Sequence, residues 1–563
     1  MTRARGILAL LLAACAFVVT GCAGFPTTGP VEYGLETGDT GDGSQNVAFI
    51  PNRPQPGASP AQIVEGFIDA GSGPGVGGNW AVAREFLAPA LQDTWKPEAG
   101  VIVDERAERD YVERDDGVVG FAFDVVATVD NIGAYERAEL APGEQVFRLE
   151  QRADGEWRIT EAPDGIWLDE AQFPTVFHRY PLMYFDPAWE YLVPDVRWFP
   201  VTTAASSIAG ALVNGPPAEW LAASVATAFP DDVTAVPSVP IDENGVAEVE
   251  LSEGIVGASA VALDRMLTQL EASLSAAGAS DVVMSVESTP IDAQPVAVRS
   301  TRVPAAPLVL VEEGFGFLTG DELDRIPGLS EAVESAAPTS VQVAPDRTVA
   351  AAKLASGAVA RLSATVVEPE VLDTRADLVD PTIDRLGIVW SVPRTAPGAV
   401  RAYLPGGEVV EVADAWAEAT WIAGMALSRD GTRIAATVVS GGRSMLWVAG
   451  VLRNADGVPE ALGTPVRLVG VGGTGLGVTW IDDVTVGVLG SGETESVVVE
   501  QVVGAPTTTS TAAAGMKSIA GGSGISSLRL LALDGTLYVK RGTTWQPTAT
   551  GIQVLATQQG APQ

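Results

Sequence analysis

The stretch GMALSRDGTRIA, residues Gly424–Ala435, is the clearest copy of a unit that recurs along the C-terminal part of this 563-residue chain. Its apolar runs on either side of Asp430-Gly431 predict a strand, a tight turn and a second strand. Weaker copies occur at Val341–Ala350, Asp384–Trp390, Thr479–Gly487 and Leu533–Tyr538. One position of the unit holds a small residue, and its successive occupants lie 37, 48 and 52 residues apart, at Ala350, Gly387, Ala435 and Gly487.

This spacing predicts the fold of the C-terminal region. A four-stranded blade of a β-propeller takes about 40–50 residues, and residues 298–563 have room for five or six blades. The region is rich in β-branched residues and turn pairs and has almost no helical period. We therefore expect an all-β propeller, in which Pro506–Gly524, with its run of threonines, forms an exposed insertion loop.

Residues 183–293 predict an α/β unit. The pattern begins with strand, turn and strand around Tyr184–Arg197, followed by a helix over Ala204–Val213. Strands within Thr234–Leu251 come next, turned by Asn244-Gly245. A long amphipathic helix, with its apolar stripe over Leu263–Leu274, and a strand at Val282–Val286 complete the unit. Gly215 and Gly278 follow the two helices as stop signals. With its Leu-Val-Pro, Gly-Pro and Phe-Pro landmarks this order resembles the GerMN domain of bacterial envelope and sporulation proteins. The resemblance implies a binding or scaffold module.

Residues 59–182 predict an α+β domain. Ser59-Pro60 is a helix start, and a second helix is expected from Asn79-Trp80 until Pro89 ends it. The expected strands are Val101–Val103, Val118–Val129, Gln145–Arg152 and Glu156–Thr160. Asp154-Gly155 should join the last two strands as a hairpin. Two helices followed by a curved antiparallel sheet resemble an NTF2-like cone, whose aromatic interior we interpret as core.

The N-terminus predicts export and lipidation. A basic start at Arg3 and Arg5 precedes the apolar run Gly6–Val19, which is too short for a stable membrane span. Val19, Thr20, Gly21 and Cys22 resemble the lipobox of bacterial lipoproteins, which places signal cleavage after residue 21 and a diacylglyceryl group on Cys22. An ordinary signal peptide with a chance cysteine is the alternative. The Gly-, Thr-, Pro- and Asp-rich residues 22–58 predict a flexible linker.

The supply of reactive side chains excludes several kinds of chemistry. The chain has two cysteines: Cys15 would leave with the signal, and Cys22 would carry lipid. A disulfide, a thiol nucleophile and a thiolate metal site are therefore not expected. His178 is the one histidine, and its surroundings of aromatic residues and proline predict a structural role rather than that of a general base. We expect no catalytic residues, no metal and no cofactor, hence no enzyme.

The charge of the chain points away from nucleic acid as a partner. The formal net charge is −37, from 34 basic and 71 acidic residues. Such a surface repels phosphates and anionic headgroups. Solubility, and spacing from an acidic wall or membrane, explain the excess of acidic residues more simply than a specific cation site does.

The order of signal, cone, GerMN-like unit and propeller is similar to that of the actinobacterial LpqB lipoprotein family, over essentially the whole chain. The resemblance implies an accessory protein on the outer face of the cytoplasmic membrane, held there by its lipid anchor. It implies as partner the extracytoplasmic domain of an MtrB-like sensor histidine kinase, paired with the response regulator MtrA. Cell-envelope homeostasis and cell division are the implied outputs, and Cys22 is the one functional residue that the resemblance transfers.

Two other functions are compatible with the sequence. The first is an extracytoplasmic sensor that binds a small molecule or a cell-wall fragment in the cone or the propeller funnel. The second is an envelope hydrolase that works through a pair of carboxylates, for which the sequence places no pair at a sugar groove. The sequence leaves open which domain contacts the kinase and in which direction the kinase is regulated.

Overall fold

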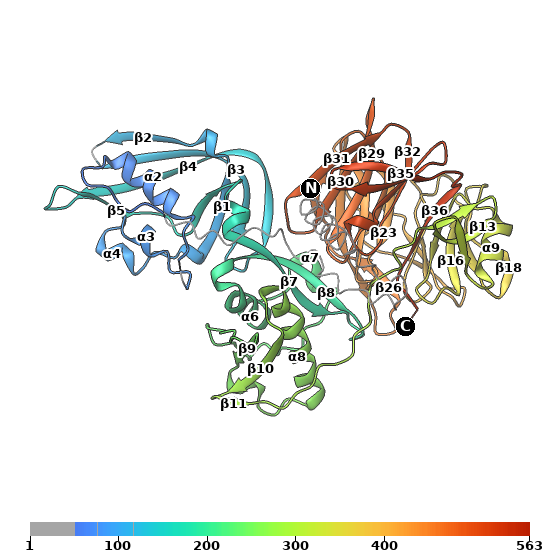
Figure 1. Cartoon of the computed structure of the whole chain (residues 1–563), viewed down its shortest axis with the longest axis horizontal. Helices are drawn as coiled ribbons and strands as arrows, with labels where there is room; N and C mark the ends of the chain where they lie inside the picture. The colour runs from blue at the N-terminus through green and yellow to red at the C-terminus, as the bar shows by residue number, and fades with distance from the viewer. Residues whose placement is uncertain (1–50, 76, 116, 563) are drawn as a thin grey trace, which may run out of the picture. The chain divides into compact units, whose positions relative to one another are not determined.

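The computed structural model describes residues 51–75, 77–115 and 117–562 (Figure 1). The expected signal over residues 1–21, the lipobox residues Val19, Thr20 and Gly21, and the lipidation site Cys22 lie outside these described residues. The same holds for all but the last part of the linker predicted over residues 22–58. In the part of the chain that the structure describes, no helix combines the length and apolarity needed to cross a membrane.

The first domain opens with the helix that its start signal predicts. Helix α2 (Pro60–Ala70) begins with a capping box, in which Ser59 Oγ accepts from Gln62 N at 3.4 Å and Gln62 Oε1 accepts from Ser59 N at 2.9 Å. The second predicted helix is wrong in extent. It is only the short α3 (Ala81–Arg84), and Pro89 does not end it but opens a further turn, α4 (Pro89–Gln92), because proline fits the first position of a helix.

A six-stranded sheet completes this domain, in the order β5-β4-β3-β1-β6 with β2 paired to β3. The strands are β1 (Gly100–Asp104), β2 (Asp110–Asp115), β3 (Val118–Asp130), β4 (Tyr135–Gln151), β5 (Trp157–Glu161) and β6 (Ile166–Asp169). Helix α2 buries Ile63, Val64 and Phe67 in the core that it shares with the sheet. Strands β2 and β6 and the first ten residues of β4 were not predicted. The domain is a mixed α/β structure, and the NTF2-like cone remains a prediction.

The second domain has the order of elements that its pattern predicts. Strands β7 (Phe177–Phe185) and β8 (Leu192–Pro200) form an antiparallel ribbon, and helices α6 (Ala204–Asn214) and α7 (Glu219–Ala222) follow. A small sheet has the order β11-β10-β9, from β9 (Val246–Glu250), β10 (Asp281–Val286) and β11 (Thr289–Pro290). Helix α8 (Ala260–Leu274) buries its apolar stripe in the domain core. Of the strands expected within Thr234–Leu251, only β9 forms, and Ala235 and Ile241 make isolated bridges.

The boundary expected between the first two domains falls inside a strand. Strand β7 begins at Phe177 and continues without interruption to Phe185, so it passes through the junction at residues 182 and 183. Phe177 packs in the core of the first domain, whereas Tyr180 and Leu182 pack in the core of the second. One strand therefore belongs to both hydrophobic cores.

Residues 308–558 form the β-propeller, whose four-stranded sheets we number as blades 1 to 6 along the chain. Blade 1 contains β12 (Leu308–Val311), β13 (Gly314–Thr319), β14 (Glu322–Arg325) and β36 (Val554–Gln558); blade 2 contains β15 (Ser340–Val343), β16 (Val349–Lys353), β17 (Val359–Ser363) and β18 (Val366–Asp373); blade 3 contains β19 (Thr382–Ile383), β20 (Val389–Ser391), β21 (Arg401–Tyr403) and β22 (Val409–Glu411).

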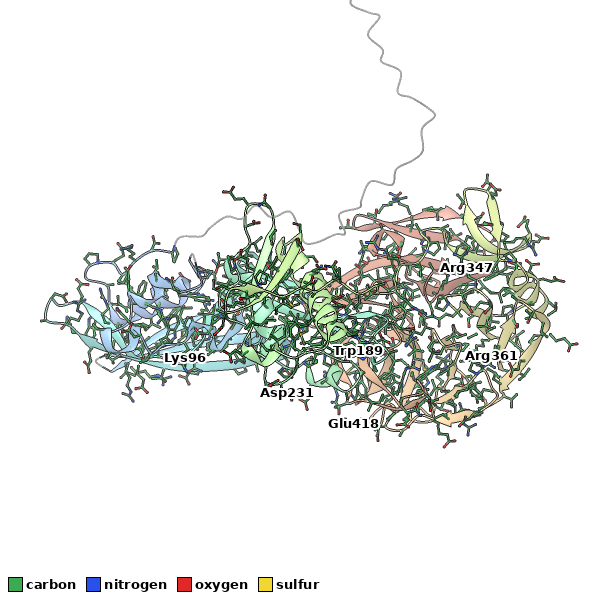
Figure 2. All side chains as sticks on the ribbon, turned by 90° about the horizontal axis from the view of Figure 1, so that it is seen from below. Lys96, Trp189, Asp231, Arg347, Arg361 and Glu418 are labelled. Atoms are coloured by element: carbon green, nitrogen blue, oxygen red, sulfur yellow. The ribbon has the colours of Figure 1, made fainter. Side chains whose placement is uncertain are left out.

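Blade 4 contains β23 (Trp421–Leu427), β24 (Arg433–Ser440), β25 (Arg443–Arg453) and β26 (Pro459–Leu462), with β27 (Val466–Gly470) as an additional strand; blade 5 contains β28 (Thr474–Trp480), β29 (Thr485–Ser491), β30 (Glu495–Val502) and β31 (Thr507–Ala513); blade 6 contains β32 (Met516–Ala520), β33 (Arg529–Ala532), β34 (Leu537–Arg541) and β35 (Thr544–Ala549). Arg361, labelled in Figure 2, connects neighbouring blades by donating from β17 to the Tyr403 carbonyl of β21 at 2.8 Å.

Three details of the propeller correct the sequence-based expectations. Pro506–Gly524 is not an insertion loop, because it contains β31 and β32, and threonine, a β-branched residue, suits an outer strand. The copy at Leu533–Tyr538 lies at the β33–β34 turn, one hairpin further out in its blade than the other copies. A helix, α9 (Leu329–Ala336), lies between β14 and β15 and packs Leu329 and Val333 into the core of blade 1.

The C-terminal strand closes the ring. Strand β36 pairs antiparallel with β12, where Val309 faces Leu555, and parallel with β15, where Gln342 faces Thr557. The innermost strand of blade 1 thus comes from the end of the propeller sequence, whereas the other three strands of that blade come from its beginning. This closure removes the exposed edges that an open array of blades would leave.

The second domain and the propeller are joined by polar contacts. Arg385, in the turn between β19 and β20, donates to Glu190 Oε2 at 2.5 Å and to Asp186 Oδ2 at 3.1 Å, and both carboxylates lie in the β7–β8 turn. Trp198 of β8 donates its indole N–H to the Gly504 carbonyl of blade 5 at 2.9 Å. The β7–β8 ribbon therefore contacts all three domains. Its side chains pack in the cores of the first two domains, and these hydrogen bonds connect it to the propeller.

A buried carboxylate between blades 2 and 3 makes the stability of the propeller sensitive to acid. Asp373, at the end of β18, accepts from Arg375 Nη2 at 2.6 Å and from Ser391 Oγ at 2.5 Å. Burial alone would raise the pKa of Asp373, but the hydrogen bonds from Arg375 and Ser391 outweigh burial and lower this pKa from 3.8 to about 2. The stabilisation is therefore fully present above about pH 4 and is lost as the pH falls toward 2.

We expect Asp373→Asn to lower the free energy of unfolding by about 2 kcal/mol at pH 7, because each pKa unit corresponds to about 1.4 kcal/mol. The difference between the variant and the parent chain should shrink as the pH falls from about 4 to 2. Because a multidomain chain does not unfold in a single transition, hydrogen exchange of the β18 and β20 amides at several pH values measures both effects. Asp321→Asn, at an exposed turn, is the control and should leave the unfolding free energy nearly unchanged. A difference for Asp373→Asn that stays constant over this pH range would contradict the prediction.

Candidate functional site in the propeller channel

The structure describes His178, but not Cys22 or the lipobox residues, among those that the sequence singled out. His178 is half-buried on β7, in register with Phe199 of β8. Over residues 51–75, 77–115 and 117–562, no group of three or more histidine, cysteine, aspartate or glutamate side chains is arranged to hold a metal ion. The polar centre that the structure does form lies elsewhere, along the axis of the propeller.

A channel of about 410 Å³ runs between the innermost strands of the six blades. These strands are β36, β15, β19, β23, β28 and β32 (Figure 1 labels β36, β23 and β32), and each contacts the next around the ring. The volume falls within the usual range for small-molecule sites, which is about 300–1,000 Å³. The walls combine apolar residues such as Leu427, Val478 and Ile519 with amide and hydroxyl groups.

One end of the channel is closed by a glutamine. Gln559, 4% exposed, follows β36 in blade 1, and its Nε2 donates to the Leu427 carbonyl of β23 at 3.2 Å. In a ring of six, blades 1 and 4 are opposite each other, so this side chain lies across the axis. Gln559 also approaches Gln342 Oε1 at 3.4 Å, and that oxygen in turn accepts from Thr382 Oγ1 at 2.7 Å.

Arg429 covers the other half of this closed end. It follows β23 of blade 4, and one terminal nitrogen, Nη2, donates to the carbonyl of Trp480 at 3.2 Å and to that of Gly522. These carbonyls belong to blades 5 and 6, so Arg429 bridges the side that Gln559 leaves open. Gln559 and Arg429 together form the floor of a blind pocket.

The buried charges behind this floor are paired, and Asp482 adds a further negative charge near Arg429. Asp430 is fully buried and accepts from Arg433 Nη2 at 2.5 Å, and Arg433 Nη1 donates to the Asp483 carbonyl at 2.7 Å. Asp483 accepts in turn from Thr301 at 2.8 Å. Burial lowers the pKa of Arg429 and raises that of Asp483, whereas the charge of Arg433 outweighs burial at Asp430 and holds its pKa below the ordinary value. Two arginines and two aspartates thus form one buried cluster.

The opposite end of the channel is its mouth. The side chains that line it there are exposed and include Thr339, Asp380, Leu476, Lys517 and Gln553. Lys517 Nζ donates to the Gln553 carbonyl at 3.1 Å, and Asp380 pairs with Lys353 at 3.4 Å. Two lysines and one aspartate therefore lie at or beside the entrance, and the aspartate is already paired with Lys353.

Several polar atoms in the channel wall have no hydrogen-bond partner among the described residues. They include the hydroxyls of Ser340 and Ser518. Both side-chain atoms of Gln558 are unpaired too, but Gln558 is in register with Val343 and so lies on the face of β36 that is opposite Thr557. Gln558 is only 7% exposed. A buried polar group that stays unpaired costs about 1–3 kcal/mol, and water or a ligand in the channel would remove this cost for the two hydroxyls. The channel is therefore a cavity with apolar side chains and hydroxyl groups along its wall.

The residues that line this channel could not be predicted from the sequence, for a physical reason. Innermost strands are packed on both faces by neighbouring blades, so their polar positions interrupt apolar runs without any period. Gln558 lies near the C-terminus, beyond the last recognised copy of the unit. Arg429 and Asp430 were within the quoted stretch, but they were interpreted only as part of a turn. The sequence signal that could have indicated this site is the pair of adjacent charged residues, Arg429 and Asp430, in the clearest copy of the repeat.

Comparison with known protein families accounts for most of the chain. The model for the N-terminal domain of lipoprotein LpqB matches residues 53–174, and the model for the LpqB beta-propeller domain matches residues 309–555. Between them, residues 181–292 match the Germane model, described as "Sporulation and spore germination". These matches confirm the propeller and the GerMN-like domain that the sequence predicted.

Curated relatives carry the same name. Lipoprotein LpqB of Thermobifida fusca is 34% identical over 41% of this chain, and the alignment spans 39% of that relative's length. Lipoprotein LpqB of Mycolicibacterium smegmatis is 25% identical, with 86% of each chain covered. Among solved structures, a putative TolB from Agrobacterium tumefaciens matches 40% of this chain and 84% of its own at 15% identity, with a TM-score of 0.29. The LpqB models and relatives show that this chain belongs to the LpqB family of actinobacterial lipoproteins.

Proposed function

We propose that this chain is a membrane-anchored, extracytoplasmic lipoprotein that regulates a sensor histidine kinase of the MtrB kind by binding its extracytoplasmic domain. The observation that carries the proposal is the LpqB family membership of a chain that also has a lipobox at Val19–Cys22. The family's models describe lipoproteins, and no catalytic activity is indicated by them. Cell-envelope homeostasis and cell division are the proposed outputs.

The proposed mechanism is tethering followed by state-selective binding. A lipid on Cys22 would confine the protein to the membrane surface, which raises its effective concentration near a membrane receptor. A partner that binds one of two kinase states more tightly shifts their equilibrium by the difference in affinity. Couplings of about 1–3 kcal/mol are typical and change activity about 5–150-fold.

The structure offers this partner three attached modules rather than a reactive centre. The β7–β8 ribbon enters the cores of the first two domains and contacts the propeller through Trp198 and the Asp186–Arg385 pair. A kinase that contacts one module can therefore be influenced by what another module binds. This continuity supports a regulatory role in which ligand binding and partner binding are coupled.

A carboxylate hydrolase is not supported by the closest pair of buried carboxylates in the first domain. Asp104 and Asp169 face each other at the ends of the parallel strands β1 and β6. Burial raises the pKa of Asp104, but both of its oxygens accept from Arg109, at 2.8 Å each. An acid whose two oxygens are held by an arginine has no free position from which to protonate a glycosidic oxygen.

We expect the purified extracytoplasmic domain of the cognate sensor kinase to bind the immobilised chain, from residue 23 onward, saturably and with a single affinity. Surface plasmon resonance with the kinase domain in solution measures this binding. The −37 charge of the chain requires a control at high salt, because screening removes non-specific attraction. Absence of binding, together with failure of the lipidated protein to crosslink to the kinase in membranes, would contradict the proposed function.

A second candidate function is supported by a different observation. The propeller channel of about 410 Å³, lined by apolar side chains and by the unpaired hydroxyls of Ser340 and Ser518, supports the sensing of a small molecule or a cell-wall fragment. This role is compatible with kinase binding, because an occupied channel can alter the module that presents it.

A further inference from the structure

We propose that residues 291–307 form a strap that couples the floor of the propeller channel to the second domain. The strap is the extended segment between β11 and β12. It is hydrogen-bonded to the second domain along its first half and to the propeller along its second half, and the two halves attach and detach together. The inference depends neither on the kinase partnership nor on a ligand in the channel.

The second domain holds the first half of the strap through backbone N–H groups. Helix α8 offers two acceptors one turn apart. Asp264 Oδ1 accepts from Gln294 N at 2.8 Å, and Thr268 Oγ1 accepts from Val296 N at the same distance. A third bond, of 2.8 Å, joins Arg299 N to a backbone carbonyl of the β7–β8 turn. The strap is therefore fixed to α8 and to the ribbon that enters the cores of the first two domains.

The propeller holds the second half of the strap at blades 5 and 6. Thr301 Oγ1 donates to Asp483 Oδ2, in the β28–β29 turn, at 2.8 Å. Val303 N donates to Ser523 Oγ at 2.7 Å. Arg529 of β33 donates to a strap carbonyl at 2.5 Å. The strap thus crosses from the second domain to the turns that lie behind the channel floor.

The two attachments are close together along the chain. Arg299 and Thr301 are two positions apart, so about 7 Å of extended chain joins the last bond to the second domain to the first bond to the propeller. A displacement of the β7–β8 turn that moves Arg299 therefore reaches Thr301 with little slack to absorb it.

Thr301 contacts a residue on which the channel floor depends. Asp483 accepts from Thr301 through its carboxylate, at 2.8 Å, and from Arg433 Nη1 through its carbonyl, at 2.7 Å. Among the nearby carboxylates, that of Asp483 acts most strongly on the charge of Arg429. Because Arg429 forms part of the floor, a strap that withdraws Thr301 changes the surroundings of the floor arginine.

The strap is less tightly packed than the domains that it connects. Residues 294–305 are mostly exposed and are held by the hydrogen bonds described above. A cavity of about 30 Å³, large enough for a water molecule, is lined by Val303 and Pro304 of the strap and by Gly521 next to β32. Segments with few buried apolar contacts open at a lower free energy than the core does. The strap can therefore detach while the domains stay folded.

Hydrogen exchange measured by mass spectrometry, on the chain from residue 23 onward, tests the coupling. Thr301→Val removes the hydroxyl but keeps the shape of the side chain. We expect it to speed exchange at least about tenfold in the turns around Asp430 and Asp483, and also at residues 294–299, because coupling acts in both directions. Thr544→Val is the matched control, since Thr544 donates to a neighbouring carbonyl at the surface, and it should leave these turns unchanged.

The decisive variant is at the other end of the strap. Asp264→Ala removes the acceptor for Gln294 N, and alanine suits a helix, so α8 should remain intact. We expect it to speed exchange at least about threefold in the turn around Asp483, which belongs to the propeller. Asp242→Ala, in the same domain as Asp264, removes a carboxylate that binds amides of its own turn, and it should have no such effect.

A change confined to residues 291–307 in Thr301→Val, or no change around Asp483 in Asp264→Ala, would overturn the proposal, and so would an equal effect of Asp242→Ala. If Thr301→Val speeds exchange throughout the propeller, Ser523→Ala takes its place, because it removes the next bond of the strap from an exposed position. All of these measurements use the free chain, so their outcome is independent of whether the kinase domain binds.

Discussion

Replacing Asp430 with alanine should lower the free energy of unfolding of the propeller by about 3–5 kcal/mol, the cost of breaking a buried ion pair by removing one partner. Asp430 and Arg433 are 2% and 1% exposed, and their side chains meet at 2.5 Å. Without Asp430, the Arg433 charge would keep the Asp483 carbonyl, the face of Trp480 and the more distant Asp483 carboxylate, but it would lose its direct ion pair. The cost arises mainly from the buried Arg433 charge, which would lose the carboxylate that is paired with it.

Asp430 also organises the turn that the best copy of the repeat encodes. Its Oδ1 accepts from Ser428 Oγ at 2.8 Å and from Thr432 N at 2.9 Å. Arg429 lies within this turn, between Ser428 and Asp430, so loss of the turn would also displace Arg429 at the channel floor. We therefore expect Asp430→Ala to weaken any ligand binding in the channel as well as the fold.

The matched control is the same turn at the surface. Asp534-Gly535-Thr536 repeats Asp430-Gly431-Thr432, and Asp534 Oδ1 likewise accepts from Thr536 N at 2.9 Å, but Asp534 is exposed. Asp534→Ala should therefore have a much smaller effect. Unfolding of the multidomain chain is not a single transition, so hydrogen exchange of β23 and β24 is the appropriate measurement. Equal destabilisation by the two variants would contradict the role assigned to the buried pair.

The second large effect concerns location. Cys22→Ala should move nearly all of the protein from the membrane fraction to the soluble extracytoplasmic fraction. Each buried CH₂ of an acyl chain contributes about 0.8 kcal/mol of membrane affinity, so the chains of a diacylglyceryl group anchor firmly where a single chain does not. Kinase-dependent output should fall with it, because the effective concentration at the membrane is lost.

Cys15→Ala is the control for Cys22→Ala, because it changes the other cysteine of the chain, which the predicted signal would remove. It should leave the protein in the membrane fraction. Fractionation and immunoblotting at native abundance measure both variants. A soluble Cys22→Ala protein that restores full signalling would contradict the tethering mechanism, and a membrane-bound one would contradict lipidation at this residue.

Local sequence patterns predicted the elements that depend on contacts between near neighbours in the sequence or on the burial of one apolar face. Helix α2 begins at Pro60 because Ser59 and Gln62 cap it through near neighbours in the sequence. Helix α8 buries the Met266 and Leu270 face that its period shows. The repeat spacing predicted the propeller, because each blade is built from the same hairpins. Strand β31 was missed because its threonines are equally compatible with a loop, and only pairing with β30 decides between them.

The sequence by itself determined the class of each domain, the LpqB-like order and the candidate anchor at Cys22, because these depend on short-range patterns of polarity and on spacing. Tertiary structure alone decided the ring closure by β36, the buried Asp430–Arg433 pair and the channel between the innermost strands. Each of these joins residues that are distant in sequence, or depends on which face of an innermost strand is turned to the axis. No local period encodes that choice, because packing between neighbouring blades makes it.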